Sequence, residues 1–307
     1  MENKISVVIP AYNEQDMISV AYNAIKNVVS TLEAEYEIIF VDDGSADDTY
    51  ANICLLAEAE PEHARGISFS RNFGKEAAVF AGMKESTGNA VIVMDCDLQH
   101  PVEVIPEMVR LWKDEGVQIV QGVKKERGKE NRIYKAFANL FNEIINGIGG
   151  IDLKDSSDFI LMDRCAVDSL IAMPEKAPFF RGLSRWIGFK TEKVPFEVAE
   201  RTVGESKWSV WGLIKYALHN IVSFSAKPLQ LVTVMGIIFV VSAVVLGIQT
   251  LCRYFTGNAL GGFTTVITLI LLTGGIIMVS LGIIGIYIAQ IYNEIKARPR
   301  YIISKRC

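Results

Sequence analysis

The chain has 307 residues, of which 50% are hydrophobic and 21% are charged, and its formal net charge is −4. This slightly acidic balance argues against a nucleic-acid-binding protein, which would carry a basic surface. The hydrophobic excess is concentrated after about residue 228, so the composition predicts a soluble part followed by a membrane part.

The cysteines and histidines do not form a recognisable ligand pattern. The five cysteines are scattered without a Cys-x-x-Cys pair, and the three histidines are far apart. This spacing predicts neither a disulfide framework nor a zinc site, and it fits a reducing cytosol. The apolar run at residues 5–9 is too short for a signal peptide, so we expect the soluble part to be cytoplasmic.

Short apolar runs alternate with helical segments in the first part of the chain. Strands are expected at residues 5–9, 36–41, 64–70, 91–94, 118–123 and 194–201, and helices at about 16–32, up to about 60, up to 84 and at 131–148. A repeated strand–helix alternation predicts an α/β fold, in which a mostly parallel sheet carries helices on both faces.

Two carboxylates follow the apolar strand at residues 91–94. Asp95 and Asp97 are separated by one residue, so on extended backbone their side chains point the same way. Open α/β sheets bind ligands at the carboxyl ends of their strands, and two carboxylates there suit Mg²⁺ or Mn²⁺ holding a diphosphate. Pro101 is placed to begin the next helix. The alternative for a single Asp-x-Asp is an ordinary polar turn.

Polar residues also follow the first and second strands. Tyr12 and Glu14 come after the first strand, and Asp42 and Asp43 after the second. Parallel strands bring these loops to one edge, which predicts a nucleotide site in which Tyr12 packs against the base. The alternative for the two aspartates is helix capping, and we expect one to cap and the other to bind. Neither a Gly-x-Gly-x-x-Gly nor a P-loop motif is present to hold the phosphates.

Cations and acids recur further along the chain. Lys124 and Arg127 lie in a charged stretch after the fifth strand, where they are either solvated surface or phosphate ligands. Acids cluster at residues 152–158, before an expected strand. The aromatic and basic run at residues 179–189 belongs either to the core or to a surface that faces lipid head groups.

The last third of the chain has the pattern of a membrane anchor. Residues 209–225 are amphipathic, which favours a helix at the membrane interface over one packed on the core. Residues 229–251 and 263–291 contain no charged residue and are long enough to cross a bilayer. Cations precede the first run and follow the second, so the positive-inside rule predicts that both ends of this two-helix segment lie in the cytoplasm. Glycines in the second run suggest a homo-oligomer contact.

Together these motifs resemble the family 2 glycosyltransferases of GT-A fold, in particular their polyprenyl-phosphate branch. That branch contains GtrB-type bactoprenol glucosyltransferases and dolichol-phosphate mannose synthases. The resemblance covers essentially the whole chain and rests on five motifs: Pro10-Ala-Tyr-Asn-Glu14, Val41-Asp-Asp-Gly-Ser45, Ser70-Arg-Asn-Phe-Gly-Lys-Glu-Ala77, Asp95-Cys-Asp-Leu-Gln-His-Pro101 and Arg201-x-x-Gly-x-Ser-Lys-Trp208.

The resemblance implies a role for each matching residue. It places the nucleotide sugar against Pro10, Tyr12, Glu14, Asp42, Asp43, Asp95, Cys96, Asp97 and Gln99. It assigns the metal, Mg²⁺ or Mn²⁺, to Asp95 and Asp97, and the catalytic roles to Asp97 and Asp158. It assigns phosphate binding to Lys124, Arg127, Arg201 and Lys207. The chain departs from the family pattern at two positions where the family often has arginine. This chain has Ile160 at one and Lys124 at the other.

The implied reaction is an inverting transfer of a sugar from a nucleotide donor to undecaprenyl phosphate, and UDP-glucose is the expected donor. The implied organisation is a cytosolic GT-A domain at 1–204, an amphipathic juxtamembrane helix at 205–228, two transmembrane helices at 229–292 and a basic cytoplasmic tail at 293–307. The protein is then a multi-pass plasma-membrane protein with no nucleic-acid partner. The alternatives are a transferase with a hydroxyl acceptor and a non-catalytic scaffold that binds a nucleotide sugar. Processive synthases carry Gln-x-x-Arg-Trp, and the Gln is missing at Gly182.

Overall fold

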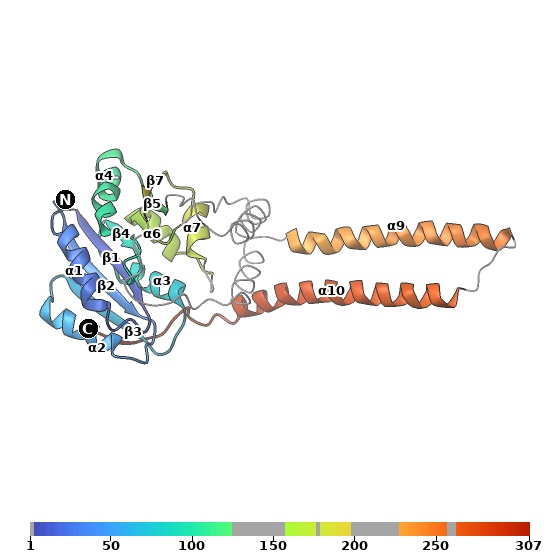
Figure 1. Cartoon of the computed structure of the whole chain (residues 1–307), viewed down its shortest axis with the longest axis horizontal. Coiled ribbons are helices and arrows are strands. Elements are labelled where there is room, and N and C mark those ends of the chain that lie inside the picture. Colours follow the sequence, from blue (N-terminus) through green and yellow to red (C-terminus); the bar gives the residue numbers. More distant parts are fainter. Residues whose placement is uncertain (1–2, 125–156, 176–178, 198–226, 257–261) are drawn as a thin grey trace. The chain divides into compact units, whose positions relative to one another are not determined.

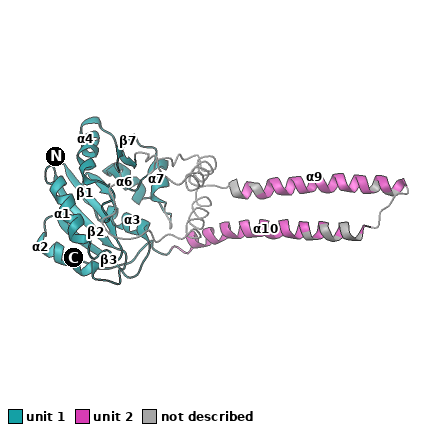
Figure 2. Ribbon diagram, in the orientation of Figure 1, with its two compact units in different colours: residues 1–146, 151–207, 298–307 teal, residues 147–150, 208–297 magenta. Residues whose placement is uncertain are grey.

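A computed structural model describes residues 3–124, 157–175, 179–197, 227–256 and 262–307 (Figure 1). The chain divides into two compact units, coloured separately in Figure 2. Unit 1 comprises residues 1–146, 151–207 and 298–307, and unit 2 comprises residues 147–150 and 208–297. The helix expected at 131–148 and the amphipathic helix expected at 209–225 lie outside the described residues.

Unit 1 is built on an eight-stranded sheet with the order β7-β5-β6-β4-β1-β2-β3-β8. The strands are β1 (Lys4–Ala11), β2 (Glu35–Asp42), β3 (Ala64–Phe69), β4 (Ala90–Val93), β5 (Ile119–Lys124), β6 (Ile160–Asp163), β7 (Thr191–Phe196) and β8 (Ile303–Arg306). The neighbours β3, β2, β1 and β4 run parallel, whereas β6 is antiparallel to both β4 and β5. The predicted α/β fold with a mostly parallel sheet is therefore confirmed.

Helices cover both faces of this sheet. They are α1 (Ile18–Val29), α2 (Thr49–Ala59), α3 (Lys75–Glu85), α4 (Ile105–Glu115), α6 (Arg164–Ile171) and α7 (Phe180–Trp186), with the short 3-10 helix η1 (Val102–Val104) after Pro101. Alternate residues of β1 serve the two faces. Val7 belongs to the core that contains α1 and α4, whereas Val8 packs against Gly82 of α3. A side chain at Gly82 would collide with Val8, so glycine permits the close packing of α3 on the sheet.

The strand register brings the loops of several strands to one edge. Ala11 at the end of β1 pairs with Asp42 at the end of β2. Val93, the last residue of β4, pairs with Ile160, the first residue of β6. Because β6 is antiparallel, the loop that precedes it lies beside the loop that follows β4. The segment before β6, which contains Asp158, thus reaches the same edge as the loops after β1, β2 and β4.

The carboxyl-terminal segment of the chain returns to unit 1. Strand β8 is antiparallel to β3, and backbone hydrogen bonds join Gly66 and Cys307 in both directions at 2.8 and 2.9 Å. Cys307 forms a disulfide with Cys54 of α2, with the Cα atoms 5.4 Å apart. The cysteine spacing predicted no disulfide framework, and it gave no indication of this one pair. Their separation of 253 residues concealed the pairing, because only the sheet topology brings β8 beside α2.

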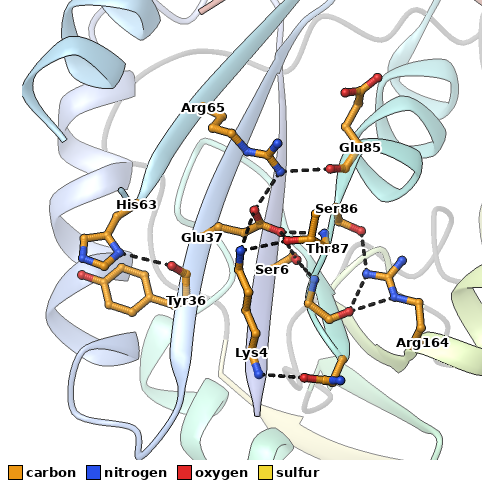
Figure 3. Close-up of polar contacts among 12 residues, drawn as sticks. Lys4, Ser6, Tyr36, Glu37, His63, Arg65, Glu85, Ser86, Thr87 and Arg164 are labelled. Carbon is orange, nitrogen blue, oxygen red and sulfur yellow. Dashed lines mark hydrogen bonds and ion pairs between the residues drawn. The ribbon is translucent and has the colours of Figure 1, made fainter. Parts of the chain in front are cut away.

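A buried carboxylate stabilises the opposite end of the sheet, near the start of the strands. Glu37 of β2 accepts hydrogen bonds from the Ser6 hydroxyl at 2.6 Å, from the Thr87 backbone N–H at 2.7 Å and from Arg65 Nη2 at 2.7 Å (Figure 3). Burial would raise the pKa of Glu37, but these hydrogen bonds and the Arg65 charge lower it to about 2. The network joins β1, β2, β3 and the turn before β4, so its role is structural.

The described residues of unit 2 form two long helices, α9 (Lys227–Phe255) and α10 (Phe263–Ile295). Within the described residues, Val232–Thr250 and Leu272–Ile295 are long and apolar enough to cross a membrane, and neither stretch is buried by the rest of the chain. The two helices coincide with the uncharged runs in the sequence, so the prediction of two apolar helices in this region is confirmed.

Candidate active site

A cavity of about 380 Å³ opens at the shared edge of the sheet in unit 1. It is lined by Pro10, Ala11, Tyr12, Glu14, Asp43, Asn72, Gly74, Lys75, Asp95, Cys96 and Asp97. All of the residues expected to bind the nucleotide sugar are in this set except Asp42 and Gln99. The cavity therefore gathers residues from the loops after β1, β2 and β4 and from the beginning of α3, as the parallel sheet requires.

The two neighbouring aspartates after β2 have different surroundings. Asp42 is 1% exposed, and its carboxylate accepts from the Ser68 hydroxyl at 2.6 Å and from the Ser45 N–H at 3.0 Å. Asp43 faces the cavity and accepts from the N–H groups of Phe73 and Gly74, at 2.7 and 2.9 Å. Burial raises the pKa of Asp43. Asp42 thus fixes the turn from within the core, while Asp43 joins the cavity to the loop that begins α3.

The loops after β1 and β2 are hydrogen-bonded to each other beside the cavity. Asn13 has a φ of 53°. Its side-chain oxygen accepts a hydrogen bond from the Ala46 N–H at 2.9 Å, and its own backbone N–H donates to the Ser45 hydroxyl at 2.9 Å. Gly44 has a φ of 69°, and a side chain there would collide with the backbone of Arg71. Tyr12 precedes Asn13 in this loop, lines the cavity and is 47% exposed.

Asp95 and Asp97 lie just beyond the end of β4, where the sequence predicted them. The turn continues through Leu98, whose φ is 54°, and the Gln99 N–H donates to Asp97 Oδ1 at 3.1 Å. The described residues contain no cluster of three or more side chains able to hold a metal ion. Two carboxylates nevertheless suit Mg²⁺ or Mn²⁺, since both ions commonly take their other ligands from phosphate oxygens and water. Asp95 already binds a cation, the ammonium group of Lys75.

A second cavity, of about 360 Å³, adjoins the first. It is lined by Lys75, Asp95, Gln99, His100, Lys124, Ser157, Asp158 and Arg181. Lys75 and Asp95 line both cavities and form the wall between them. Lys124 comes from the end of β5 and Asp158 from the segment before β6, so the antiparallel insertion of β6 builds this part of the site.

Asp158 is the best-bound acid in the second cavity. It accepts from Arg181 Nε at 2.6 Å, from Arg181 Nη2 at 2.8 Å and from Lys75 Nζ at 2.8 Å. Burial would raise the pKa of Asp158, but the hydrogen bonds from Arg181 and the charge of Lys75 hold it well below its ordinary range. The Asp158 carboxylate is therefore ionised and fixed in orientation.

Lys75 and Arg181 carry no role in the sequence analysis, although both residues are in segments that it singled out. Arg181 lies on α7, within the aromatic and basic run at residues 179–189. Phe180 and Leu183 of that helix are buried, at 1% and 4% exposed, whereas Trp186 is 66% exposed. The Glu76 carboxylate accepts from the Phe180 N–H at 2.9 Å and so attaches the start of α7 to α3.

Three of the expected phosphate ligands lie outside the described residues. These are Arg127, Arg201 and Lys207. Lys124 is described and lines the second cavity. Gln99 lines the second cavity rather than the first, and Cys96 lines the first, where burial raises its pKa to about 12. The assignment of ligands to all of these residues stays a prediction.

Similarities to known proteins extend over the whole chain. The family described as "Glycosyl transferase family 2" matches residues 6–169. A prophage bactoprenol glucosyl transferase homolog of Escherichia coli (strain K12) is 38% identical, over 98% of this chain and 99% of its own. The bactoprenol glucosyl transferase of Shigella phage SfII is 36% identical, over 98% of each chain.

Solved structures share this fold over much of the chain. Glucosyl-3-phosphoglycerate synthase from Mycobacterium tuberculosis, in complex with Mn²⁺, uridine diphosphate and phosphoglyceric acid, superposes with a TM-score of 0.52. Its sequence is 21% identical, and the match covers 72% of this chain and 76% of the synthase. At this level of identity the similarity establishes the GT-A type of fold alone.

Proposed function

The chain belongs to glycosyl transferase family 2, and on that premise we propose that it transfers a sugar, glucose in the first instance, from a nucleoside diphosphate to polyprenyl phosphate. The family predicted from the sequence is confirmed. Two relatives that match over nearly their full length have bactoprenol glucosyl transferase in their names, which supports a lipid phosphate as the acceptor. The observation that carries the proposal is the pair of adjoining cavities with a common wall at Lys75 and Asp95.

The first cavity is the proposed donor site. Tyr12 offers an exposed aromatic ring to a base, and Asp43 is held against the loop that begins α3. Asp95 and Asp97 are the residues that would hold Mg²⁺ or Mn²⁺. When bound, such an ion offsets the negative charge of the donor diphosphate and of the departing nucleoside diphosphate. UDP-glucose is the donor that we propose.

The second cavity is the proposed acceptor site, where Lys75, Lys124 and Arg181 supply positive charge for a phosphate. In the reaction an acceptor phosphate oxygen forms a bond to the anomeric carbon, while the bond from that carbon to the donor β-phosphate oxygen breaks. The electron pair of the broken bond leaves with the nucleoside diphosphate. Because the acceptor phosphate is already anionic, it needs no strong base, so Asp158 is proposed to orient the acceptor site through Arg181 and Lys75.

The two apolar helices support a membrane location for the acceptor reaction. We propose that α9 and α10 both cross the membrane and that unit 1 and the tail after α10 are cytoplasmic. Strand β8 pairs with β3 of unit 1, which is consistent with unit 1 and the end of the chain lying on the same side. The interfacial helix at 205–228 and the homo-oligomer stay predictions.

The direct test is release of nucleotide by the purified full-length chain. The assay contains undecaprenyl phosphate, Mn²⁺ or Mg²⁺, and each of a panel of UDP- and GDP-sugars. We expect release with one donor, dependent on both the lipid and the metal, and a product that acid cleaves as a sugar phosphodiester. An acid-stable product would support a hydroxyl acceptor, and donor binding without release would support a scaffold.

The variant Asp97→Ala tests the site itself, and we expect it to abolish turnover. Asp168→Ala is the matched control, because it removes a carboxylate of 64% exposure whose nearest cation, Arg164, is 3.7 Å away. Asp168→Ala is expected to keep the wild-type rate. Wild-type turnover by Asp97→Ala, with metal supplied, would overturn the proposed donor site.

A further inference from the structure

The cation in the wall between the two cavities is the ammonium group of Lys75. Lys75 Nζ lies 2.6 Å from Asp95 Oδ1 and 2.8 Å from Asp158 Oδ2. Asp95 is a proposed donor-site residue and Asp158 a proposed acceptor-site residue. The ammonium group of Lys75 therefore bridges the two halves of the site.

The backbone of Lys75 is fixed while its side chain is accessible. Lys75 is the first residue of α3 and follows Gly74, whose φ is 100° and whose N–H donates to Asp43 at 2.9 Å. The Lys75 side chain is 43% exposed, and it enters both cavities. A long, flexible side chain that starts from a fixed point can reach more than one partner within the site.

An ammonium group and a divalent cation compete for the same carboxylate oxygen. Mg²⁺ binds a carboxylate oxygen at about 2.1 Å, and an ammonium group 2.6 Å from Asp95 Oδ1 occupies the space that such an ion needs. Two cations so close together would also repel each other strongly. Metal binding at Asp95 Oδ1 therefore requires Lys75 to leave that oxygen.

We propose that Lys75 is a positioning residue. Its ammonium group occupies the place of the divalent cation on Asp95, and when the metal displaces it, the ammonium group moves to the acceptor cavity. This inference rests on the proposed function and deepens it. Donor loading then completes the acceptor site, because the displaced ammonium group joins Lys124 and Arg181 around the second cavity. The phosphate acceptor meets its full set of cations only after the metal-bound donor is in place.

A purely structural role explains the position of Lys75 less well. Asp158 keeps its two hydrogen bonds to Arg181 if Lys75 departs. Asp95 is 29% exposed, so water can replace the ammonium group there. The Lys75–Asp95 pair, whose side chains are 43% and 29% exposed, is of a kind that contributes little to stability. The loss of Lys75 should consequently change ligand binding much more than folding.

The test measures Mn²⁺ binding to the purified full-length chain without nucleotide or lipid, by the electron paramagnetic resonance signal of free Mn²⁺. Lys75→Met should bind Mn²⁺ roughly five- to tenfold more tightly than the wild type, since no ammonium group competes for Asp95. Lys75→Arg keeps a competing cation and should stay near the wild-type affinity. Lys124→Met removes an equal charge from the second cavity and should change Mn²⁺ affinity less than twofold by the same estimate.

Lys75→Met should also lose most of its lipid-dependent nucleotide release despite its tighter metal binding. Equal Mn²⁺ affinity in Lys75→Met and the wild type, or an equal gain in Lys124→Met, would overturn the inference. Lys75→Gln serves as the second neutral variant, and thermal unfolding of each variant checks that it is folded. If the wild type is active and metal-dependent but Lys75→Met binds Mn²⁺ with the wild-type affinity, only the role of Lys75 is refuted. Metal-independent transfer by the wild type would instead refute the metal in the proposed function.

Discussion

Arg181 holds Asp158 through two parallel hydrogen bonds, from Nε to Oδ1 at 2.6 Å and from Nη2 to Oδ2 at 2.8 Å. This bidentate geometry is specific to the guanidinium group, which matches a carboxylate in shape as well as in charge. It fixes the plane of the Asp158 carboxylate and stabilises its ionised form. A carboxylate held in this way is a weak base, and its fixed position orients the cations around it.

The first prediction concerns the pH dependence of turnover. The pKa of Asp158 lies well below its ordinary range, so protonation of Asp158 does not limit the wild-type rate near neutral pH. In Arg181→Gln the hydrogen bonds that lower this pKa are lost while burial, which raises it, remains. The acid limb of the pH–rate profile, measured from about pH 5 to 9, should therefore move to higher pH, with a rate loss of roughly 10²-fold from misorientation.

Arg181→Lys is the control for this prediction, since it keeps the positive charge without the two parallel bonds. It should keep an acid limb close to that of the wild type and still turn over more slowly. If Arg181→Gln kept both the wild-type rate and the wild-type acid limb, the orienting role of Asp158 would be untenable.

The second prediction concerns Glu76 and the stability of the protein. Burial, together with the negative charge of Asp158, raises the pKa of Glu76 from 4.5 to about 7. The folded state then binds a proton that the unfolded state has released, so this group's contribution to stability falls as pH rises from 4.5 to about 7. Glu76→Gln removes that dependence and keeps an oxygen to accept from the Phe180 N–H.

Thermal unfolding of the wild type and Glu76→Gln in the same detergent measures this difference. The stability of Glu76→Gln minus that of the wild type should be larger at about pH 8 than at about pH 5. Glu60→Gln is a suitable control, because Glu60 is paired with Lys26 at a solvent-accessible position and its pKa is lowered, not raised. A difference of constant size at both pH values would contradict the assigned titration of Glu76.

Local sequence patterns were sufficient to place most residues of the first cavity at one edge of the sheet. Tyr12, Asp43, Asp95 and Asp97 each follow a parallel strand, and parallel strands must end at one edge. The same patterns did not distinguish Asp42 from Asp43. We expected one aspartate to cap and the other to bind, but Asp43 both lines the cavity and holds the loop before α3, while Asp42 is buried. Burial of this kind is decided by tertiary packing that neighbouring residues do not reveal.

The second cavity depends on contacts between distant segments. Lys75 and Asp158 are 83 residues apart in the sequence, and they meet because β6 is inserted antiparallel beside β4. A lysine at the start of a helix is most often solvated, so its sequence context gave no reason to assign it a role. The pairing of β8 with β3 was missed for the same reason, since a short basic segment after an apolar helix has the pattern of a tail.

The third prediction concerns the disulfide between Cys54 and Cys307. A covalent link between α2 and the end of β8 restricts the unfolded chain, and such links typically contribute about 2–4 kcal/mol. Under oxidising conditions Cys307→Ser should unfold at a lower temperature than the wild type. With dithiothreitol present the two proteins should unfold together, because the backbone bonds between Gly66 and Cys307 do not need the sulfur. A difference that persists after reduction would mean that the serine disturbs packing instead.

The last prediction concerns the topology of α9. Cys252 lies near the end of α9, beyond the apolar stretch Val232–Thr250, and is exposed. If α9 crosses the membrane and unit 1 is cytoplasmic, Cys252 faces the opposite side from unit 1. Two variants test this, each in a Cys165→Ser background. One keeps Cys252, and the other replaces Cys252 with serine and carries Lys84→Cys on the exposed surface of α3.

A membrane-impermeant maleimide is added to right-side-out vesicles before and after permeabilisation. The Cys252 variant should react in intact vesicles, whereas the Lys84→Cys variant should react only after permeabilisation. Inside-out vesicles should give the reverse order, which separates a difference in sidedness from a difference in intrinsic thiol reactivity. Labelling of both positions from the same side would mean that α9 does not cross the membrane. The apolar surface of α9 would then have to be covered by lipid in the plane of the interface or by another protein.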